Sequence, residues 1–408
     1  MEKIVEKVIL VGVCESAVAD ADRYLDELYE LAKTAGAETV ARVVQTRDYV
    51  HPTTYVGTGK LEEIKDLIDV TGATGIICDD ELTPSQMNNM EKILDTKVMD
   101  RTILILDIFA GRAKTQEGKI QVELAQLRYS LTRLAGYGKS MSRLGGGIGT
   151  RGPGESKLES DRRVVKNRIS KLKAELAEIV KHRTVTRARR ERTNIPVLAI
   201  VGYTNAGKST LLNTLTDSNV LSEDKLFATL DPTTRKYTLK DGEEVLLTDT
   251  VGFIDKLPHH LIEAFKSTLE EAKYSDIIVH VVDASDPEAY EKMNVVYDTL
   301  HSLKVEGRPV ITLFNKCDVA GSDHGLKDLR ARKAINVSAL TTKGIEEFNR
   351  AIEEILSERK VEIKRTFPFT EAGKIQLIRK TGKLLVEDYR EDGIYVEAFV
   401  PKETAGRL

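Results

Sequence analysis

The segment from Gly202 to Ser209 has the residue types and spacing of a phosphate-binding loop. It fits the pattern GxxxxGK[ST] and directly follows the apolar run Val197–Val201. Glycines let backbone N–H groups close around a phosphate at the start of a helix. Lys208 can then reach β- and γ-phosphate oxygens, and the Ser209 hydroxyl can bind Mg²⁺. The residues expected to contact the nucleotide are Gly202, Tyr203, Thr204, Asn205, Ala206, Gly207, Lys208 and Ser209.

A second predicted strand end carries groups that can act on the terminal phosphate. The run from Val245 closes in the pattern DxxG at Asp249 and Gly252. Asp249 is expected to hold Mg²⁺ through a water molecule, and the Gly252 amide to contact the γ-phosphate. With Lys208, these two residues are the predicted catalytic groups. The residues of this motif expected at the nucleotide are Asp249, Thr250, Val251 and Gly252.

Two further strand ends predict recognition of a guanine base. The first ends in NKxD, which comprises Asn315, Lys316, Cys317 and Asp318. A carboxylate at Asp318 can accept hydrogen bonds from the N1–H and 2-amino groups of guanine, a donor pair that adenine lacks. The second strand end reads Ser338, Ala339 and Leu340, and can present a backbone amide to guanine O6.

The order of the four motifs argues for a single site. The carboxyl ends of parallel strands meet at one edge of an α/β sheet, where ligands bind. Incidental strand-end turns would not place all four motifs in this order.

A magnesium ligand that also senses the γ-phosphate is expected between the first two motifs. A loop in that interval would act as a switch. The interval Leu226–Arg235 contains three candidates, Thr229, Thr233 and Thr234. Spacing alone does not choose among them.

Composition excludes several protein classes. The 408 residues are 41% hydrophobic and 31% charged, which is ordinary for a globular protein and unlike a disordered or collagen-like chain. No stretch approaches the roughly 20 apolar residues of a membrane span. The three cysteines, Cys14, Cys78 and Cys317, are odd in number and widely spaced, which favours packed thiols in a reduced compartment. We therefore expect a cytoplasmic protein without an integral membrane segment.

The charge is distributed unevenly along the chain. Between Gly111 and Thr193 there are 21 Lys and Arg against 8 Asp and Glu, a local charge of +13, while the remaining residues carry −16 and the total is −3. A basic region in an otherwise acidic chain predicts a polyanionic partner. The alternative is a solvated helical face.

Within the basic region two apolar stripes repeat at helical spacing. They step by four and three residues, from Ile120 to Leu134 and again from Val165 to Ile179, as in an antiparallel helical hairpin. The connection from Gly136 to Gly154 contains eight glycines together with Lys139, Arg143 and Arg151. Glycine permits close backbone approach and arginine fits phosphate bidentately. The connection therefore predicts a nucleic-acid contact that binds phosphates with little base specificity, and the alternative is a flexible linker.

The fold class predicted is α/β, with a mostly parallel sheet in the phosphate-loop domain. Alternating strand and helix signals before residue 110 predict a smaller α/β domain at the N-terminus. Short strand signals after residue 360 predict a small α+β domain. The expected divisions are residues 1–110, the hairpin 111–193 with its tip at 136–157, the nucleotide-binding domain 194–360, and 361–408.

The chain resembles translation-factor-class GTPases, and over nearly its whole length the HflX family. The resemblance is carried by three segments, Gly145–Arg163, Phe227–Arg235 and Asp249–Ile254, with Asp107–Ala113 and Val122–Leu127 upstream. It implies GTP as substrate, GDP as product, and a Mg²⁺-dependent hydrolase. It also implies that Thr229 is the second magnesium ligand after Ser209, and so a fourth catalytic residue beside Lys208, Asp249 and Gly252. The segment implied to lie over the nucleotide comprises Phe227, Ala228, Thr229, Leu230 and Asp231.

The resemblance also implies partners and a rate. HflX proteins bind the large ribosomal subunit, and some split or rescue stalled ribosomes, so ribosomal RNA is the expected partner of the hairpin tip. Phe253 follows DxxG where Ras-type enzymes have a water-orienting Gln, so intrinsic hydrolysis is expected to be slow and faster on the ribosome. In related GTPases the counterpart of Asn205 helps to hold K⁺, which makes K⁺ a candidate second cation. We expect a monomer.

Overall fold

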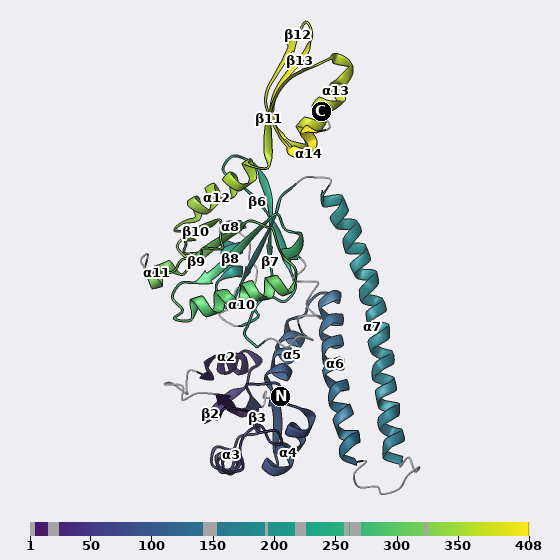
Figure 1. The fold of residues 1–408 in the computed structure, drawn as a ribbon, viewed down its shortest axis with the longest axis vertical. Coiled ribbons are helices and arrows are strands. Elements are labelled where there is room, and N and C mark those ends of the chain that lie inside the picture. Colours follow the sequence, from purple (N-terminus) through teal and green to yellow (C-terminus); the bar gives the residue numbers. More distant parts are fainter. Residues whose placement is uncertain are drawn as a thin grey trace. The chain divides into compact units, whose positions relative to one another are not determined.

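The computed structural model describes residues 5–14, 24–141, 153–191, 195–216, 226–256, 261, 271–321, 325–406 and 408. Figure 1 shows the chain with its helices and strands labelled. It divides into two compact units. The first comprises residues 1–180, 223–231 and 251–269, and the second comprises residues 181–222, 232–250 and 270–408. The first unit thus includes residues 223–231, which follow the phosphate-binding loop, and residues 251–269, which begin within the DxxG motif.

The N-terminal part of the first unit is a parallel four-stranded sheet. Its strand order is β2-β1-β3-β4. The central strand β1 is buried along seven of its eight residues, as expected for a β-branched run inside a sheet. The strands and helices are β1 (Lys7–Cys14), α2 (Asp26–Ala35), β2 (Glu38–Thr46), α3 (Thr58–Thr71), β3 (Gly75–Cys78), α4 (Pro84–Leu94), β4 (Lys97–Asp100) and α5 (Arg101–Arg112). The predicted alternation of strand and helix is confirmed.

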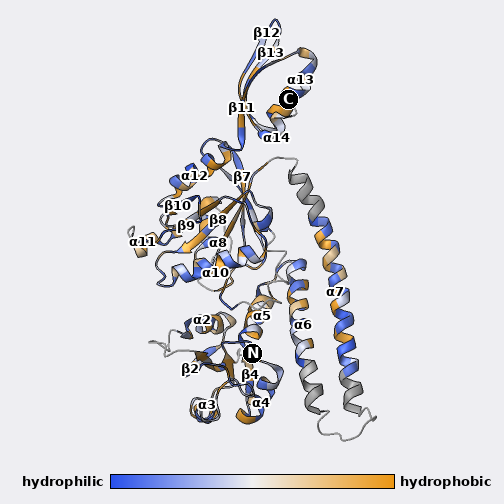
Figure 2. Cartoon of the chain, viewed as in Figure 1, coloured by the Kyte–Doolittle hydropathy of each residue, from blue (hydrophilic) through white to orange (hydrophobic). Residues whose placement is uncertain are grey.

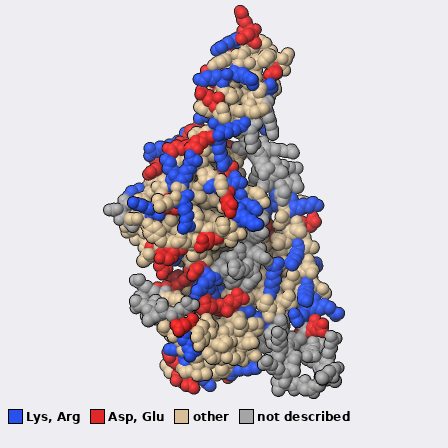
Figure 3. All heavy atoms as spheres, viewed as in Figure 1, with Lys and Arg blue, Asp and Glu red and all other residues tan. Residues whose placement is uncertain are grey.

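Two long helices follow, α6 (Gln116–Met141) and α7 (Pro153–Glu191). The predicted apolar stripes meet between them, because Ile120, Leu124 and Leu172 are buried in one cluster. Figure 3 shows Lys and Arg side chains over α7, and Arg168 of this helix forms a forked ion pair with Glu123 of α6 at 2.7 and 2.9 Å.

The connection between these helices is shorter than the sequence predicts. Helix α6 continues through Gly136 and Gly138 to Met141, since a helix tolerates isolated glycines at about 1 kcal/mol each. Residues 142–152 of the expected tip, with Arg143 and Arg151, lie outside the described residues.

The second unit is built on a six-stranded sheet of order β10-β9-β8-β5-β7-β6. All neighbouring strands are parallel except the edge pair β6 and β7. Figure 2 shows that the central strands are hydrophobic, and most of their inward side chains are fully buried. The elements are β5 (Val197–Gly202), α8 (Lys208–Thr216), β6 (Thr233–Thr238), β7 (Glu244–Asp249), β8 (Ile277–Asp283), α10 (Ala289–Ser302), β9 (Val310–Asn315), α11 (Cys317–Ala320), β10 (Lys333–Asn336) and α12 (Ile345–Ser357). The predicted fold class is confirmed.

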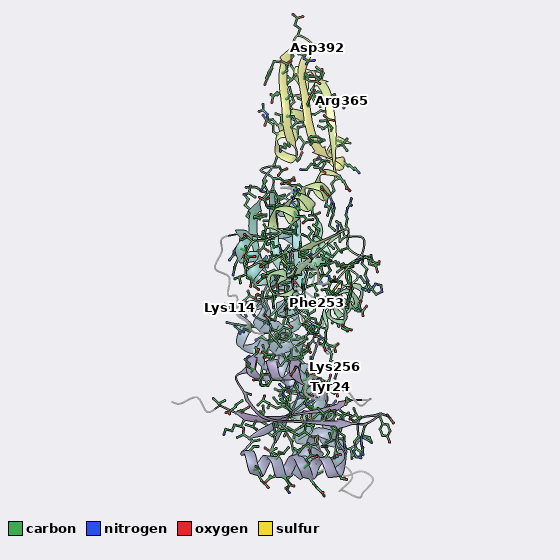
Figure 4. The ribbon with its side chains drawn as sticks, turned by 90° about the vertical axis from the view of Figure 1, so that its left-hand side faces the viewer. Tyr24, Lys114, Phe253, Lys256, Arg365 and Asp392 are labelled. Atoms are coloured by element: carbon green, nitrogen blue, oxygen red, sulfur yellow. The ribbon has the colours of Figure 1, made fainter. Side chains whose placement is uncertain are left out.

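The last part of the chain is an antiparallel three-stranded sheet of order β11-β13-β12. It comprises β11 (Lys360–Phe367), α13 (Ala372–Thr381), β12 (Lys383–Arg390), β13 (Gly393–Pro401) and α14 (Lys402–Ala405). Its core contains alternate residues of β13, among them Val396, Ala398 and Val400. They pack with Phe367 of β11 and with Ile375 and Ile378 of α13. Figure 4 places Asp392 at the turn between β12 and β13. Among the described helices of the whole chain, none combines the length and the apolar character that crossing a membrane requires.

Candidate nucleotide site

Two glycines of the phosphate-binding loop are required by close backbone approach. A Cβ atom on Gly202, the last residue of β5, would lie 2.2 Å from the carbonyl oxygen of Val281. A Cβ atom on Gly207 would lie 2.2 Å from Nδ2 of Asn315, and Gly207 has a φ of +93°. No other residue type fits these two positions, so the loop path depends on the glycines that the motif specifies.

Lys208 lies in the loop with its ammonium group buried. Its Nζ donates a hydrogen bond to the carbonyl oxygen of Tyr203 at 2.6 Å. Burial lowers the pKa of Lys208 to about 8, and the nearby carboxylate of Asp249 only partly opposes that shift. A buried ammonium group of this kind is stabilised by an anion, as a phosphate would provide.

Ser209 and Asp249 bring a hydroxyl and a carboxylate into contact. The Ser209 Oγ donates to Asp249 Oδ2 at 2.7 Å, and Asp249 is fully buried at the end of β7. The next residue, Thr250, fixes this strand end by donating through Oγ1 to the carbonyl oxygen of Ile200 on β5 at 2.8 Å. Mg²⁺ binds oxygen ligands and is often held by a carboxylate together with substrate phosphates. The residues therefore fit a magnesium ion.

Asn315 joins the phosphate-binding loop to the predicted base-binding loop. Its Nδ2 donates to the carbonyl oxygen of Ala206 at 2.9 Å, and its Oδ1 accepts from the backbone N–H of Ala339 at 2.9 Å. The side chain is buried. One amide thus fixes two loops that come from distant parts of the sequence.

The rest of the NKxD motif is held in a strained turn. Lys316 has a φ of +61°, and its Nζ forms an ion pair with Asp283 at the end of β8 at 2.6 Å. Cys317 is a buried thiol, as predicted for the cysteines. Asp318 is exposed, so its carboxylate is open to a ligand. In the neighbouring loop Ser338 is buried and accepts from the Thr341 N–H, whereas Leu340 is exposed.

The three threonines that are candidates for the second magnesium ligand differ in their position relative to strand β6. Thr233 and Thr234 belong to β6, where they pair with Asp249 and Thr248 of β7, and the Thr234 hydroxyl is 3.0 Å from that of Thr248. Thr229 precedes the strand. Its assignment as a magnesium ligand stays a prediction.

The four predicted catalytic residues divide between the two units. Lys208 and Asp249 belong to the second unit, whereas Thr229 and Gly252 belong to the first. Within the first unit Gly252 and Phe253 are buried. The side chains of Phe227 and Asp231, which were expected at the nucleotide, contact helix α5 and the residues before α6.

Sequence reasoning missed a polar cluster after strand β3. Asp79 and Asp80 follow Cys78 directly, and both form ion pairs with Lys256, at 2.6 and 3.0 Å. Paired carboxylates at the end of a buried strand are a signal that could have been noticed. Their partner could not have been found, because it lies more than 170 residues away in the sequence.

Comparison with known proteins gives three family matches. Residues 22–110 match a family described as "GTP-binding GTPase N-terminal", and residues 112–190 match "GTP-binding GTPase Middle Region". Residues 197–316 match "50S ribosome-binding GTPase".

Individual relatives cover almost the whole chain. "GTPase HflX" of Lacrimispora saccharolytica is 60% identical over 408 residues, which is 100% of this chain and 96% of the relative. "GTPase HflX" of Escherichia coli is 41% identical over 355 residues, covering 86% of this chain and 83% of the relative. A solved complex of the protein SsGBP with GDP has a TM-score of 0.49 and 26% identity, covering 87% of this chain and 99% of that one.

Proposed function

The chain belongs to the HflX family of GTPases, and from this premise we propose that it is a Mg²⁺-dependent GTPase of the cytoplasm that binds the large ribosomal subunit and splits or rescues stalled ribosomes. In this proposal the basic hairpin contacts ribosomal RNA, and the GTPase cycle times release. The observation that carries the enzymatic part is the contact between Ser209 Oγ and Asp249 Oδ2 beside the buried Lys208.

Each side chain of the site has a defined task in the proposed reaction. The Lys208 ammonium group attracts the β- and γ-phosphates, and phosphate binding raises its depressed pKa. The Ser209 hydroxyl would hold Mg²⁺ directly and the Asp249 carboxylate would hold it through a water molecule. The bound ion would neutralise negative charge on the phosphate oxygens. Thr229 and Gly252 would respond to the γ-phosphate, with Thr229 as the second protein ligand of the metal.

The proposed base specificity rests on Asp318 and Asn315. The exposed carboxylate of Asp318 can accept both guanine donors, and the Asn315 amide holds the loop of Ser338 and Ala339 in place. A binding site that hydrogen-bonds a substrate N–H group strongly rejects analogues that lack it. We therefore infer selection of guanine over adenine nucleotides.

Phe253 bears on the rate. This side chain is buried and has no polar atom, so it cannot orient an attacking water molecule. Slow intrinsic hydrolysis follows, together with acceleration when the ribosome orders the segments around Thr229 and Gly252. The same observation favours a second candidate, a nucleotide-gated RNA-binding adaptor in ribosome assembly or on another RNA, in which hydrolysis acts only as a timer.

The hairpin supports an RNA partner through its charge. Its residues 111–193 carry +13, and the neighbouring family match is described as a "50S ribosome-binding GTPase". Each phosphate neutralised by Lys or Arg contributes to a salt-dependent affinity. Binding through the tip would therefore weaken steeply as salt is raised.

The test is cosedimentation of the full chain with purified large ribosomal subunits over a range of KCl concentrations. One triple variant replaces Lys139, Arg143 and Arg151 with Gln, and the matched control replaces the exposed Lys65, Lys92 and Lys380 with Gln. We expect the tip variant to bind more weakly and its salt slope to fall by about 2 to 3, since each lost phosphate contact removes about 0.7 to 0.9. GTP affinity should be unchanged in both. Equal ribosome binding by the two variants would contradict a tip contact.

A further inference from the structure

Helix α5 and the residues between α5 and α6 contact both segments that are expected to sense the γ-phosphate. We call residues 226–231 the switch I segment and residues 251–256 the switch II segment. We propose that α5 and α6 read the conformation of both segments through Asp231, Phe227 and Lys256, and so couple the bound nucleotide to the basic hairpin. This inference rests on the proposed function, because it takes GTP and GDP as the ligands that move the segments.

Asp231 is the contact between the switch I segment and the hairpin. Its Oδ2 accepts the backbone N–H groups of Lys114 and Thr115, both at 2.9 Å, and its Oδ1 accepts the Thr115 hydroxyl at 2.5 Å. Thr115 in turn accepts the Gly118 N–H at 3.0 Å, in the first turn of α6. A carboxylate at a helix N-terminus is stabilised by free N–H groups and by the helix dipole. Thr115 therefore caps the first turn of α6, and Asp231 holds Lys114 and this cap residue from a distant segment.

Phe227 provides a second attachment of the same segment. Its ring packs edge-on against Phe109 of α5, with centroids 4.7 Å apart and planes at 72°, and both side chains are buried. Thr229, the expected magnesium ligand, lies midway between Phe227 and Asp231 in the sequence. A change in the position of Thr229 must therefore strain or break one of two attachments to α5 and α6.

The switch II segment is attached to the other end of α5. Lys256 has a φ of +49° and reaches both Asp79 and Asp80, and it also donates to the Tyr24 hydroxyl at 3.0 Å. Figure 4 shows Lys256 and Tyr24 side by side. Burial opposes the charge on Lys256, but Asp79 and its neighbours outweigh burial and raise the pKa of Lys256. Arg101, the first residue of α5, donates to the Asp255 carbonyl oxygen at 3.2 Å and to Asp79 at 2.8 Å.

The Asp100 carboxylate links α5 to α6 through hydrogen bonds. This fully buried carboxylate caps α5 by accepting the Ile103 N–H at 3.0 Å. It also accepts the Tyr129 hydroxyl at 2.9 Å and Arg133 at 2.5 Å, both from α6. Buried charge networks of this kind do not deform gradually, because each lost bond leaves a group unsatisfied. A displacement of either switch segment therefore acts on the base of the hairpin.

The experiment is hydrogen exchange on the full chain, saturated either with GDP or with a non-hydrolysable GTP analogue. The reporters are the backbone amides of Lys114, Thr115 and Gly118. The internal control is the start of helix α4, which is capped by its own residues Thr83 and Gln86 and contacts neither switch segment through any described hydrogen bond. We expect the reporter amides to exchange at least about tenfold differently in the two nucleotide states, and the α4 amides to exchange equally.

Three variants separate coupling from simple loss of stability. Asp231→Ala removes the three hydrogen bonds that hold Lys114 and the cap residue Thr115. The matched control is Asp241→Ala, at an exposed turn carboxylate that also accepts a backbone N–H, from Glu243 at 2.9 Å. Gly118→Ala places a Cβ 2.4 Å from Asp231 Oδ1, so it displaces Asp231 while replacing a helix-disfavouring glycine by alanine. We expect Asp231→Ala and Gly118→Ala to reduce the nucleotide-dependent difference in exchange to less than about twofold, and Asp241→Ala to leave it intact.

Two results would overturn the inference. One is equal exchange of the reporter amides in both nucleotide states of the unmodified chain. The other is an unchanged difference in both Asp231→Ala and Gly118→Ala while the α4 amides report a folded protein. Ribosomes are absent from this experiment, so its result can be interpreted even if the proposed ribosomal role is wrong. A failure to bind nucleotide would be detected separately by titration with GDP or the GTP analogue. With large subunits added, the ratio of affinities in the two nucleotide states should be about fivefold or more and should approach one in Asp231→Ala.

Discussion

Replacing Asn315 with alanine tests how far one buried amide holds the nucleotide site together. The change removes two hydrogen bonds, to the Ala206 carbonyl oxygen and from the Ala339 N–H, both 2.9 Å long. Each buried bond contributes about 1 kcal/mol net, so we expect the free energy of unfolding to fall by about 2 kcal/mol or more. If both loops must be ordered to bind nucleotide, GDP affinity falls by up to the same free energy, roughly 30-fold.

The matched control is Asn349→Ala in the same unit. Asn349 is also buried, and it accepts one hydrogen bond from the Tyr237 hydroxyl at 3.0 Å. This variant should lose about 1 kcal/mol of stability with unchanged GDP affinity. Affinity is measured by fluorescence titration and stability by urea unfolding. The reasoning is refuted if Asn315→Ala binds GDP as tightly as the unmodified chain, whatever its stability.

Four further predictions concern the second unit and its ligands. Asp318→Asn should weaken GTP binding about 10- to 100-fold, since a hydrogen bond to a charged group contributes about 1.5 to 3 kcal/mol. The same variant should bind xanthosine triphosphate more tightly. An unchanged preference for GTP over xanthosine triphosphate in competition titrations would contradict the base assignment. The pKa of Lys208 is lowered to about 8, so its ammonium group is lost as pH rises above 8. GDP affinity should therefore change little between pH 7 and 7.5 and fall above pH 8, and a flat profile to pH 9.5 would be inconsistent with this role. Burial lowers the pKa of His280 to about 4, although Asp328 acts in the opposite direction. The unfolded state therefore binds the extra proton, and the free energy of unfolding should fall by about 3 kcal/mol between pH 6.5 and 4. Urea unfolding of His280→Gln should no longer show this pH dependence. Replacing KCl with NaCl should slow hydrolysis if Asn205 helps to hold K⁺, and equal rates would exclude that role.

The strand-end positions of the predicted nucleotide-site motifs could be predicted because their signals are local. The phosphate-binding loop, the DxxG motif and NKxD each follow a strongly apolar strand, and the structure places Gly202, Asp249 and Asn315 at the last position of β5, β7 and β9. The strands themselves follow from β-branched runs. The positions of Thr233 and Thr234 in a strand paired with β7 could not be read from spacing, and the choice of Thr229 rests on the family resemblance and stays a prediction.

The contacts of the switch segments were not predictable from sequence. Asp231 lies 116 and 117 residues from its partners Thr115 and Lys114, and Lys256 lies 177 residues from Asp79. No periodicity or local motif connects positions so far apart, because such contacts depend on how whole elements pack. The resemblance to HflX proteins implied a nucleotide-facing role for Phe227 and Asp231, which stays a prediction. It did not indicate that Phe227 packs on α5 or that Asp231 bonds to the residues before α6.

The helical hairpin was predicted from the sequence only in part. Its heptad-like stripes correctly predicted that Leu124 and Leu172 would be buried together. The length of the connection was overestimated, because glycine content indicates a loop only on average and α6 continues to Met141.

We propose above all that this HflX-family GTPase acts on the large ribosomal subunit. The most direct measurement is the rate of GTP hydrolysis in potassium and magnesium buffer, with and without purified large ribosomal subunits. We expect slow turnover of the free protein, because Phe253 cannot orient water, and strong stimulation by the subunit. Equal rates in the presence and absence of the subunit, with GTP still bound tightly, would contradict the account.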